Sequence, residues 1–182
     1  MRVERCALPE VMIVEPSVFT DARGVFFETY HAERFRDAGI ADAFVQDNHS
    51  ISMRGVLRGL HAQARHPQAK LVRCVAGTVF DVAVDARRGA ATFGRWIGVE
   101  LSAENRRQLY VPAGFLHGFC VLGASAEVVY KCSAVYAPGD EFGVVWNDPD
   151  LAIAWPIAEP TVSAKDAALP RLAQLADRLP AS

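Results

Sequence analysis

The stretch Val56-Leu57-Arg58-Gly59-Leu60-His61-Ala62-Gln63, followed by Arg65-His66-Pro67 and Lys70, decides how the rest of the chain is interpreted. It joins a β-forming run to two histidines, two arginines, a glutamine and a lysine. A core strand does not need this chemistry, whereas a pocket that binds an anion and moves protons does. We therefore ask which other segments of the chain face the same pocket.

Composition indicates an ordinary globular protein and limits its partners. The chain has 182 residues, with 51% hydrophobic and 22% charged residues and a net charge of −2. This length predicts a single domain, residues 1–182. The charge offers no basic field for nucleic acid, and we expect no signal peptide and no membrane span. The four cysteines form no Cys-x-x-Cys pair, which favours reduced thiols in the cytoplasm.

Apolar runs of strand length, separated by glycine and proline turns at intervals of about 8–12 residues, predict an all-β sandwich or barrel. A short helix is expected over residues 32–38, closed by Gly39. A helical tail is expected over 163–182, with Ser163 as its N-cap. A turn is expected at Gly77. The expected strands cover residues 8–16, 25–30, 44–52, 71–76, 78–85, 95–101, 108–111, 116–122 and 127–136.

A second corner, Pro112-Ala113-Gly114-Phe115-Leu116-His117, makes the fold prediction more specific. Pro-x-Gly-x-x-His is one of the two sequence marks of the cupin barrel, and it places the histidine at the barrel mouth. The other cupin mark carries His-x-His and a glutamate, whereas this chain has His61-Ala62-Gln63. We therefore expect a cupin jelly-roll barrel, a double-stranded β-helix, that has lost its metal. A site made by His61, His66 and His117 remains the metal-binding alternative.

Without a metal, the remaining residue types favour proton abstraction next to a carbonyl. A histidine such as His61 removes a carbon-bound proton, a lysine such as Lys70 stabilises the enolate oxygen, and a tyrosine such as Tyr130 returns a proton from the other face. Judged from spacing alone, Tyr130 is better explained by core packing and Lys70 by a solvated surface position.

Beyond these residues, the chain closely resembles the dTDP-4-dehydrorhamnose 3,5-epimerase family over residues 11–169. The resemblance implies epimerisation at C3 and C5 of dTDP-4-dehydro-6-deoxy-D-glucose, giving dTDP-4-dehydro-L-rhamnose, with no cofactor. It rests on Arg23-Gly24-Val25-Phe26-Phe27-Glu28, Gln46-Asp47-Asn48-His49-Ser50, Val56-Leu57-Arg58-Gly59-Leu60-His61, Lys70-Leu71-Val72-Arg73, the segments 77–85, 92–96 and 101–109, Gly114-Phe115-Leu116-His117-Gly118-Phe119, Tyr130-Lys131-Cys132 and Ser163-Ala164-Lys165-Asp166.

The resemblance also implies roles for individual residues. His61 matches the family's general base, and Asp166 matches the carboxylate that orients its imidazole. Tyr130 matches the general acid, and Lys70 matches the residue near the C4 oxygen. A carboxylate partner fixes the tautomer of a histidine and raises its basicity, so the tail is expected to fold back on the barrel.

A further set matches substrate-contacting positions. Within it, arginines suit a diphosphate, and Phe19 and Phe26 match positions that stack thymine. Asp81, which is not one of these positions, is expected to pair with His117. The family forms homodimers by exchanging N-terminal strands, so the hairpin of about residues 8–30 is expected to serve a partner's pocket. The matched positions are Arg23, Glu28, Gln46, Asn48, Arg58, His117, Glu141, Lys165, Phe19 and Phe26.

One departure keeps alternatives open. The family usually has an aromatic residue after the base histidine, where this chain has Ala62, and we expect Ala62 to enlarge the pocket wall. The alternatives are a mono-epimerase or ketoisomerase acting on a related dTDP-4-keto-6-deoxy sugar in an antibiotic-sugar pathway, a metal-dependent cupin enzyme, and a non-catalytic sugar-nucleotide binder.

Overall fold

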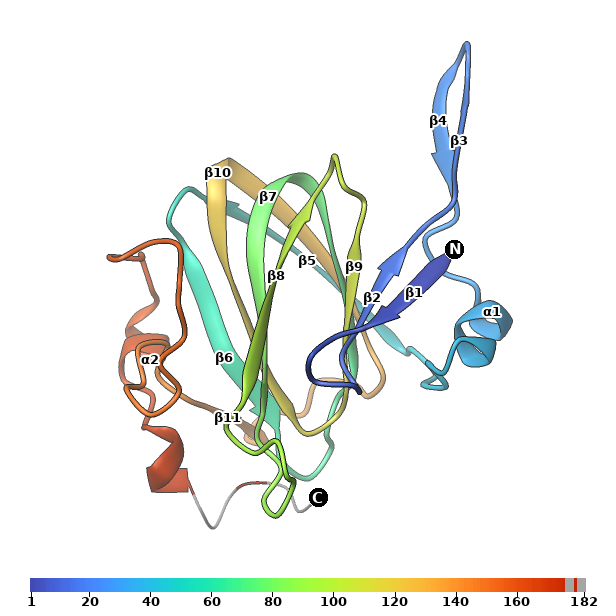
Figure 1. The fold of residues 1–182 in the computed structure, drawn as a ribbon. Coiled ribbons are helices and arrows are strands. Elements are labelled where there is room, and N and C mark those ends of the chain that lie inside the picture. The colour runs from blue at the N-terminus through green and yellow to red at the C-terminus, as the bar shows by residue number, and fades with distance from the viewer. Residues whose placement is uncertain (176–178, 180–182) are drawn as a thin grey trace.

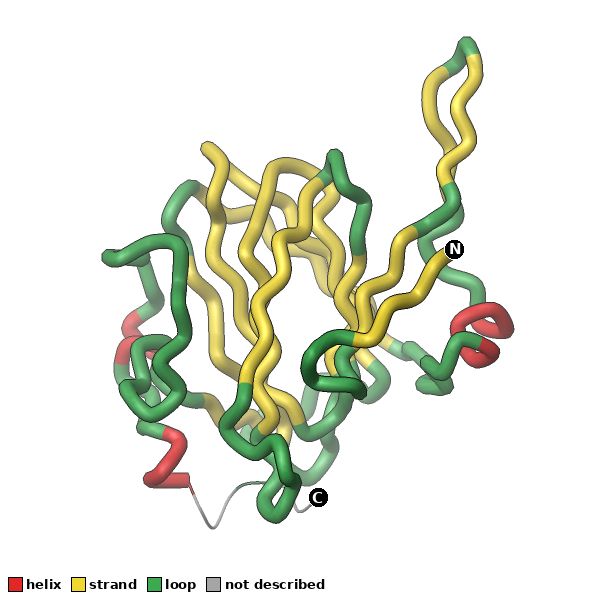
Figure 2. The backbone as a smooth tube through the Cα atoms, in the orientation of Figure 1, coloured by secondary structure: helices red, strands yellow, loops and turns green. Residues whose placement is uncertain are grey.

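The fold is a β-barrel with short helices at its edges. A computed structural model of the chain describes residues 1–175 and Leu179. Strands surround a central space, and the helices and the longer loops lie outside it (Figures 1 and 2). No helix in the described residues is long and apolar enough to cross a membrane. This arrangement confirms the all-β prediction with short flanking helices.

The sheet order brings sequence-distant strands together. One path of neighbours runs β1-β2-β9-β7-β10-β6-β11, while β5 pairs with β10 and β8 with β7. The strands are β1 Arg2–Arg5, β2 Met12–Glu15, β3 Val18–Asp21, β4 Gly24–Phe27, β5 Gln46–Met53, β6 Leu57–Gln63, β7 Lys70–Asp85, β8 Trp96–Ser102, β9 Gln108–Val111, β10 Phe115–Cys132 and β11 Glu141–Gly143. The helices are α1 Ala32–Asp37, α2 Ala164–Ala167 and the 3-10 helix η1 Leu172–Leu175.

Two long strands correct the sequence prediction. The turn expected at Gly77 does not end a strand, because β7 runs from Lys70 to Asp85. The two strands expected over 116–122 and 127–136 are likewise one strand, β10. Gly77 has φ +74°, and a Cβ there would lie 2.0 Å from the Ser125 carbonyl oxygen. The glycine therefore bends the long β7–β10 ladder where its register shifts, and pairing continues on both sides.

The tail agrees in part with its prediction. Ser163 caps α2, since the backbone N–H of Asp166 donates to the Ser163 hydroxyl oxygen over 3.0 Å. The described part of the tail is not one continuous helix, because residues 168–171 are not helical. η1 covers Leu172–Leu175, and part of the expected tail, residues 176–178 and 180–182, lies outside the described residues.

The barrel interior has an apolar half and a polar half. Residues two apart on a strand share a face, so Phe119 and Val121 lie on the same side of β10 as His117. Both are buried in the main apolar cluster, together with Val72 and Val128. Phe119 also lines the pocket described below, so this apolar cluster borders that pocket.

Strands β6 and β10 approach each other closely at two glycines. A Cβ on Gly118 would lie 2.7 Å from the Arg58 carbonyl oxygen, and a Cβ on Gly59 would lie 2.5 Å from the Gly118 Cα. The β6–β10 register shifts between His117 and Phe119 at the same place. Any side chain here would push the two strands apart.

We expect Gly118→Ala to destabilise the fold by about 1–3 kcal/mol, because the methyl group would collide with backbone that cannot rotate away. Gly123→Ala is the matched control in the same strand, since its Cβ would meet nothing closer than 3.6 Å. Urea unfolding of both variants measures the difference. Equal midpoints for the two variants would show that the approach of β6 to β10 does not require a glycine.

Candidate active site

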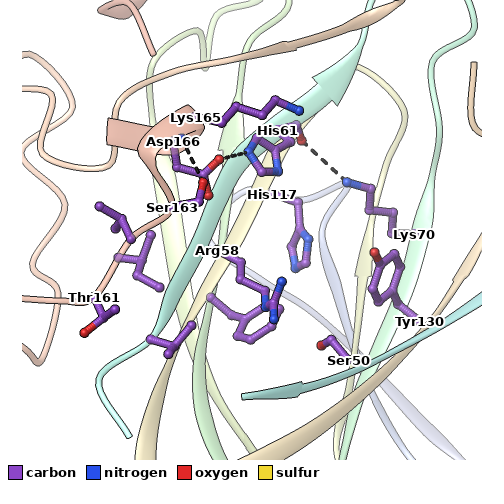
Figure 3. Close-up of a pocket in the computed structure, with 14 residues that line it drawn as sticks. Ser50, Arg58, His61, Lys70, His117, Tyr130, Thr161, Ser163, Lys165 and Asp166 are labelled. Atoms are coloured by element: carbon purple, nitrogen blue, oxygen red, sulfur yellow. Dashed lines mark hydrogen bonds and ion pairs between the residues drawn. The ribbon is translucent and has the colours of Figure 1, made fainter. Parts of the chain in front are cut away.

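A pocket of about 450 Å³ opens at one end of the barrel. Its wall comes from four strands and from the tail (Figure 3). Residues 161–163 close one side, held by the pairing of Thr161 with Val56. The expected site residues that line it are Arg58, His61, Lys70, His117, Tyr130, Lys165 and Asp166.

His61 and Asp166 form the central pair of the pocket. The His61 Nε2 lies 2.9 Å from the Asp166 Oδ1, although the two residues are separated by 105 positions in the sequence. The Gly59 backbone N–H donates to the Asp166 Oδ2 at 3.3 Å. An ionised carboxylate only accepts hydrogen bonds, so Nε2 carries the proton of a neutral His61 and Nδ1 keeps its lone pair. This arrangement leaves Nδ1 able to accept a proton.

Lys70 is buried beside this pair. Its Nζ donates to the His61 carbonyl oxygen over 3.5 Å, and no ion pair of Lys70 occurs among the described residues. Burial lowers the pKa of the Lys70 ammonium, an effect that nearby Cys132 and Asp81 oppose. A negative charge developing in the pocket would therefore find a cation with little water around it.

Tyr130 comes from β10 and lies apart from the His61 ring in the view of Figure 3. Burial raises the pKa of its phenol, and the charge of Cys132 acts in the same direction. The phenol is therefore neutral near pH 7 and has a proton to donate. The ring of Tyr130 lies near that of His117, with centroids 6.4 Å apart.

His117 is held by a buried carboxylate. Its Nε2 lies 3.0 Å from both carboxylate oxygens of Asp81, and both residues are buried. The pairing expected from the sequence is present. It orients the His117 ring at the pocket wall, in the same manner as Asp166 orients His61.

Two cationic side chains give the pocket positive charge. The Arg58 Nε donates to the Ser52 hydroxyl oxygen at 3.0 Å. Lys165 pairs with Glu141, which places that β11 carboxylate at the rim. Such groups suit an anionic ligand.

The other expected binding residues lie outside this pocket. Gln46 donates to the Asn48 side-chain oxygen, and Asn48 donates to the Cys132 sulfur. The projecting hairpin of β3 and β4 stands away from the barrel (Figure 1) and carries Phe19 and Phe26, 64% and 70% exposed. Arg23 pairs with Asp21 there. After the hairpin, Glu28 pairs with Arg34.

Two residues near His61, Ala62 and His66, differ from their predicted places. Ala62 is buried in a second apolar cluster with Leu60 and Phe142, because alternate residues of β6 face opposite sides. It therefore does not widen the pocket wall, and that prediction was wrong. His66 contacts the Asp140 carboxylate rather than the pocket. No group of three or more His, Cys, Asp or Glu side chains placed to hold a metal occurs in the described part of the chain.

Sequence reasoning also missed part of the pocket. Ser50 lines it from β5, although the sequence analysis placed it only within a family-like stretch. The signal was the alternation of that strand, which puts Gln46, Asn48 and Ser50 on one face. Thr161 and Val162 had no comparable signal, because they reach the pocket through a loop.

The jelly-roll barrel and its acid–base pocket define a cupin-fold enzyme site. A family model described as dTDP-4-dehydrorhamnose 3,5-epimerase matches residues 5–174. The chain is 56% identical over 168 residues to the dTDP-4-dehydrorhamnose 3,5-epimerase of Pseudomonas aeruginosa, covering 91% of this chain and 93% of that protein. The chain therefore belongs to the dTDP-4-dehydrorhamnose 3,5-epimerase family and is an isomerase of that activity.

Solved structures agree with this assignment. The 3,5-epimerase of Legionella pneumophila, in complex with dTDP-4-keto-L-rhamnose, superposes with a TM-score of 0.97 at 48% identity, covering 100% of this chain and 98% of that one. A 4-keto-6-deoxy sugar epimerase from the novobiocin gene cluster of Streptomyces spheroides has a TM-score of 0.95 at 41% identity, covering 100% and 93%.

The burial of Lys70 predicts a gain in stability when its charge is removed. Its pKa in the folded chain lies below the unfolded value of about 10.4. Between these two values the unfolded chain binds more protons, so wild-type stability rises with pH. Lys70→Met should therefore raise Tm at pH 7, by roughly 2–4 °C for each kcal/mol gained in the free energy of unfolding. The gain should shrink as the pH approaches the pKa of lysine in the unfolded chain.

Thermal unfolding at several pH values checks this prediction. Lys131→Met is the control, because Lys131 forms an ion pair with Asp47 at the surface, and it should give no such gain. A Lys70→Met variant less stable than wild type at pH 7 would contradict the prediction.

Proposed function

We propose that this chain inverts both C3 and C5 of dTDP-4-dehydro-6-deoxy-D-glucose by proton transfer next to the C4 ketone. The observation that carries the proposal is that the His61–Asp166 pair shares one pocket with a buried lysine and a partly buried tyrosine. The likeness to a 3,5-epimerase in complex with dTDP-4-keto-L-rhamnose supports the same substrate class.

The first step uses His61 as general base. Its Nδ1 takes the proton from C5, and the C–H electron pair moves into the C4 carbonyl to form an enolate. The ketone is what makes this proton acidic, so the carbon needs neither oxidation nor reduction. Asp166 holds Nε2 and stabilises the imidazolium that forms.

Lys70 stabilises the charge that this step creates. Burial disfavours its ammonium, and an enolate oxygen beside it restores the preference for the charged form. The interaction is therefore stronger in the transition state than with the neutral ketone, which is what lowers a barrier.

Tyr130 completes the inversion. Its phenol gives a proton to C5 from the face opposite to His61: the C4–C5 π pair of the enolate forms the new C–H bond, and a lone pair of the enolate oxygen re-forms the C4 carbonyl. The raised pKa keeps the phenol protonated at neutral pH, and the phenolate formed regains its proton from solvent, to which His61 releases its own. The same sequence at C3 gives the second inversion.

Incubation in D2O separates the two roles. Wild type should place deuterium at C3 and C5. His61→Ala should lose about 100-fold or more of the exchange rate, because no base remains. Tyr130→Phe should still exchange solvent deuterium through His61 but should lose inversion to a similar extent. NMR and mass spectrometry of the sugar measure both.

His66→Ala is the matched control, because that histidine is exposed and bonded to Asp140. Near wild-type exchange by the His61 variant would contradict the mechanism. Deuterium at one centre only would identify a mono-epimerase. Activity that is lost on chelation and returns with a divalent metal would favour a metal-dependent cupin enzyme, and binding with no exchange would indicate a sugar-nucleotide binder.

We further propose that the chain is a cytoplasmic homodimer in which the hairpin of β3 and β4 completes a partner's pocket. The support is the exposure of Phe19 and Phe26 on a hairpin that stands clear of its own barrel. The four free cysteines, three of them buried, suit a reducing compartment.

Mixing two inactive variants tests the exchange. Arg23→Ala and His61→Ala each remove one part of the site. In a mixed dimer, one of the two pockets would combine its own intact His61 with the intact hairpin of the partner. Random pairing should therefore restore about a quarter of the wild-type sites. Turnover assays before and after co-refolding measure this recovery. No recovery, with mixed dimers shown by mass, would contradict hairpin exchange.

A further inference from the structure

Asp148 is a buried carboxylate that the proposed mechanism does not use. It is 1% exposed and lies in the loop that follows β11. One of its carboxylate oxygens accepts the backbone N–H of Asp150 at 2.8 Å, and the other accepts the backbone N–H of Leu172 at 2.7 Å. Burying a charge is costly unless hydrogen bonds compensate it. The bond to Leu172 spans 24 positions of the sequence and joins this loop to the C-terminal tail.

This bond is one of three contacts that fasten the tail to β11 and the loop after it. The Val145 backbone N–H donates to the Pro170 carbonyl oxygen at 2.9 Å. The Leu169 side chain lies against the backbone of Gly143, where an added Cβ would be 2.8 Å from the Leu169 Cδ1. All three contacts follow closely after Asp166 in the sequence.

The same contacts tie the tail to the strand that carries the base. Gly143 of β11 is the direct partner of His61 in the ladder between β11 and β6. On the other side of Asp166 in the sequence, Thr161 pairs with Val56, just before β6 begins. The segment that presents Asp166 is therefore fastened before and after this residue to β6 and to the strand beside it.

The helix between these fastenings is too short to fix its own position. α2 has four residues, Ala164–Ala167, and lies outside the barrel beside β6 (Figure 1). An isolated helix of this length is unstable in water, so contacts of the flanking segments decide where its side chains lie. Asp166 must keep its Oδ1 2.9 Å from the His61 Nε2 (Figure 3). A shift of the tail by about 1 Å would be enough to weaken that contact.

We infer that Asp148 is a positioning residue, which holds the tail so that the Asp166 carboxylate stays on the His61 Nε2. The inference rests on the proposed function for the role of His61, and Asp148 acts without touching the substrate. A carboxylate suits this task because both of its oxygens accept, so it binds the N–H groups of Asp150 and Leu172 together. An amide side chain has one acceptor oxygen and would lose one of the two bonds.

Steady-state kinetics of Asp148→Asn test this assignment. The substitution keeps the size of the side chain but turns an NH2 group toward one of the two backbone N–H groups. With dTDP-4-dehydro-6-deoxy-D-glucose, kcat should fall about 5- to 50-fold, because the base is less well oriented. KM should change less than about 2-fold, because the binding side chains are left in place. Asp150→Asn is the matched control, since the Asp150 side chain is exposed, and it should keep the wild-type kcat.

Proton NMR of the free protein separates positioning from stability. The Nε2 proton of His61, bonded to a carboxylate, should give a signal far downfield that exchanges slowly with water, and His61→Ala identifies this signal by its loss. Asp148→Asn should weaken the signal or move it upfield, toward the spectrum of Asp166→Ala. An unchanged signal or an unchanged kcat would make Asp148 a structural residue and overturn the inference, even if Tm falls. So would a loss of activity that is carried by KM.

Leu169→Ala is the second variant, and it decides the question if Asp148→Asn does not fold. It loosens the same attachment at Gly143 without leaving a buried polar group unpaired, and Leu169 is only half-buried. It should show the same fall in kcat and the same NMR change, and wild-type values for both would then overturn the inference. The NMR signal needs no turnover, so it tests positioning even if wild type exchanges no deuterium into the sugar, which is the result by which the proposed function itself fails.

Discussion

The contact between the His61 ring and the Asp166 carboxylate is the interaction on which the rest of the site depends. It joins a barrel strand to the C-terminal tail, and it sets which nitrogen of the histidine carries the proton. Three further features serve it. The Ser163 cap starts the short helix that presents Asp166, the Gly59 N–H binds the second carboxylate oxygen, and the Gly118 contact lets β6 lie close enough to β10 for His61 and Tyr130 to share one pocket.

Burial shifts the pKa values of the other two groups, Lys70 and Tyr130, in opposite directions. The same loss of water lowers the pKa of Lys70 and raises the pKa of Tyr130. The lysine gains most when an anion forms beside it, and the tyrosine stays protonated until a carbanion needs its proton. The shielding of the pocket from water thus makes Lys70 a stabiliser of negative charge and keeps Tyr130 available as an acid.

Local patterns predicted the fold class, whereas the centre of the site was predicted from the resemblance to the family. Alternation and turn residues gave the strands, and His61, Lys70, His117, Tyr130 and Asp166 meet in one pocket. The errors arose where a local rule met long-range pairing. Gly77 has the sequence of a turn, but its ladder continues on both sides. Ala62 adjoins the histidine in sequence and faces the opposite side of the strand. Ser50 was missed as a pocket residue although the alternation of β5 places it on the same face as Gln46 and Asn48.

The expected binding residues are divided between two parts of the chain. In a single chain the pocket holds the acid–base groups and Arg58, whereas Arg23, Phe19 and Phe26 stand on a hairpin that projects from the barrel. Large aromatic side chains on a narrow, two-stranded projection gain little from their own fold. Their exposure is explained if they cover another chain's pocket. Chemistry and nucleotide recognition would then be divided between two copies, and the rate of the reaction would depend on association as well as on the residues around His61.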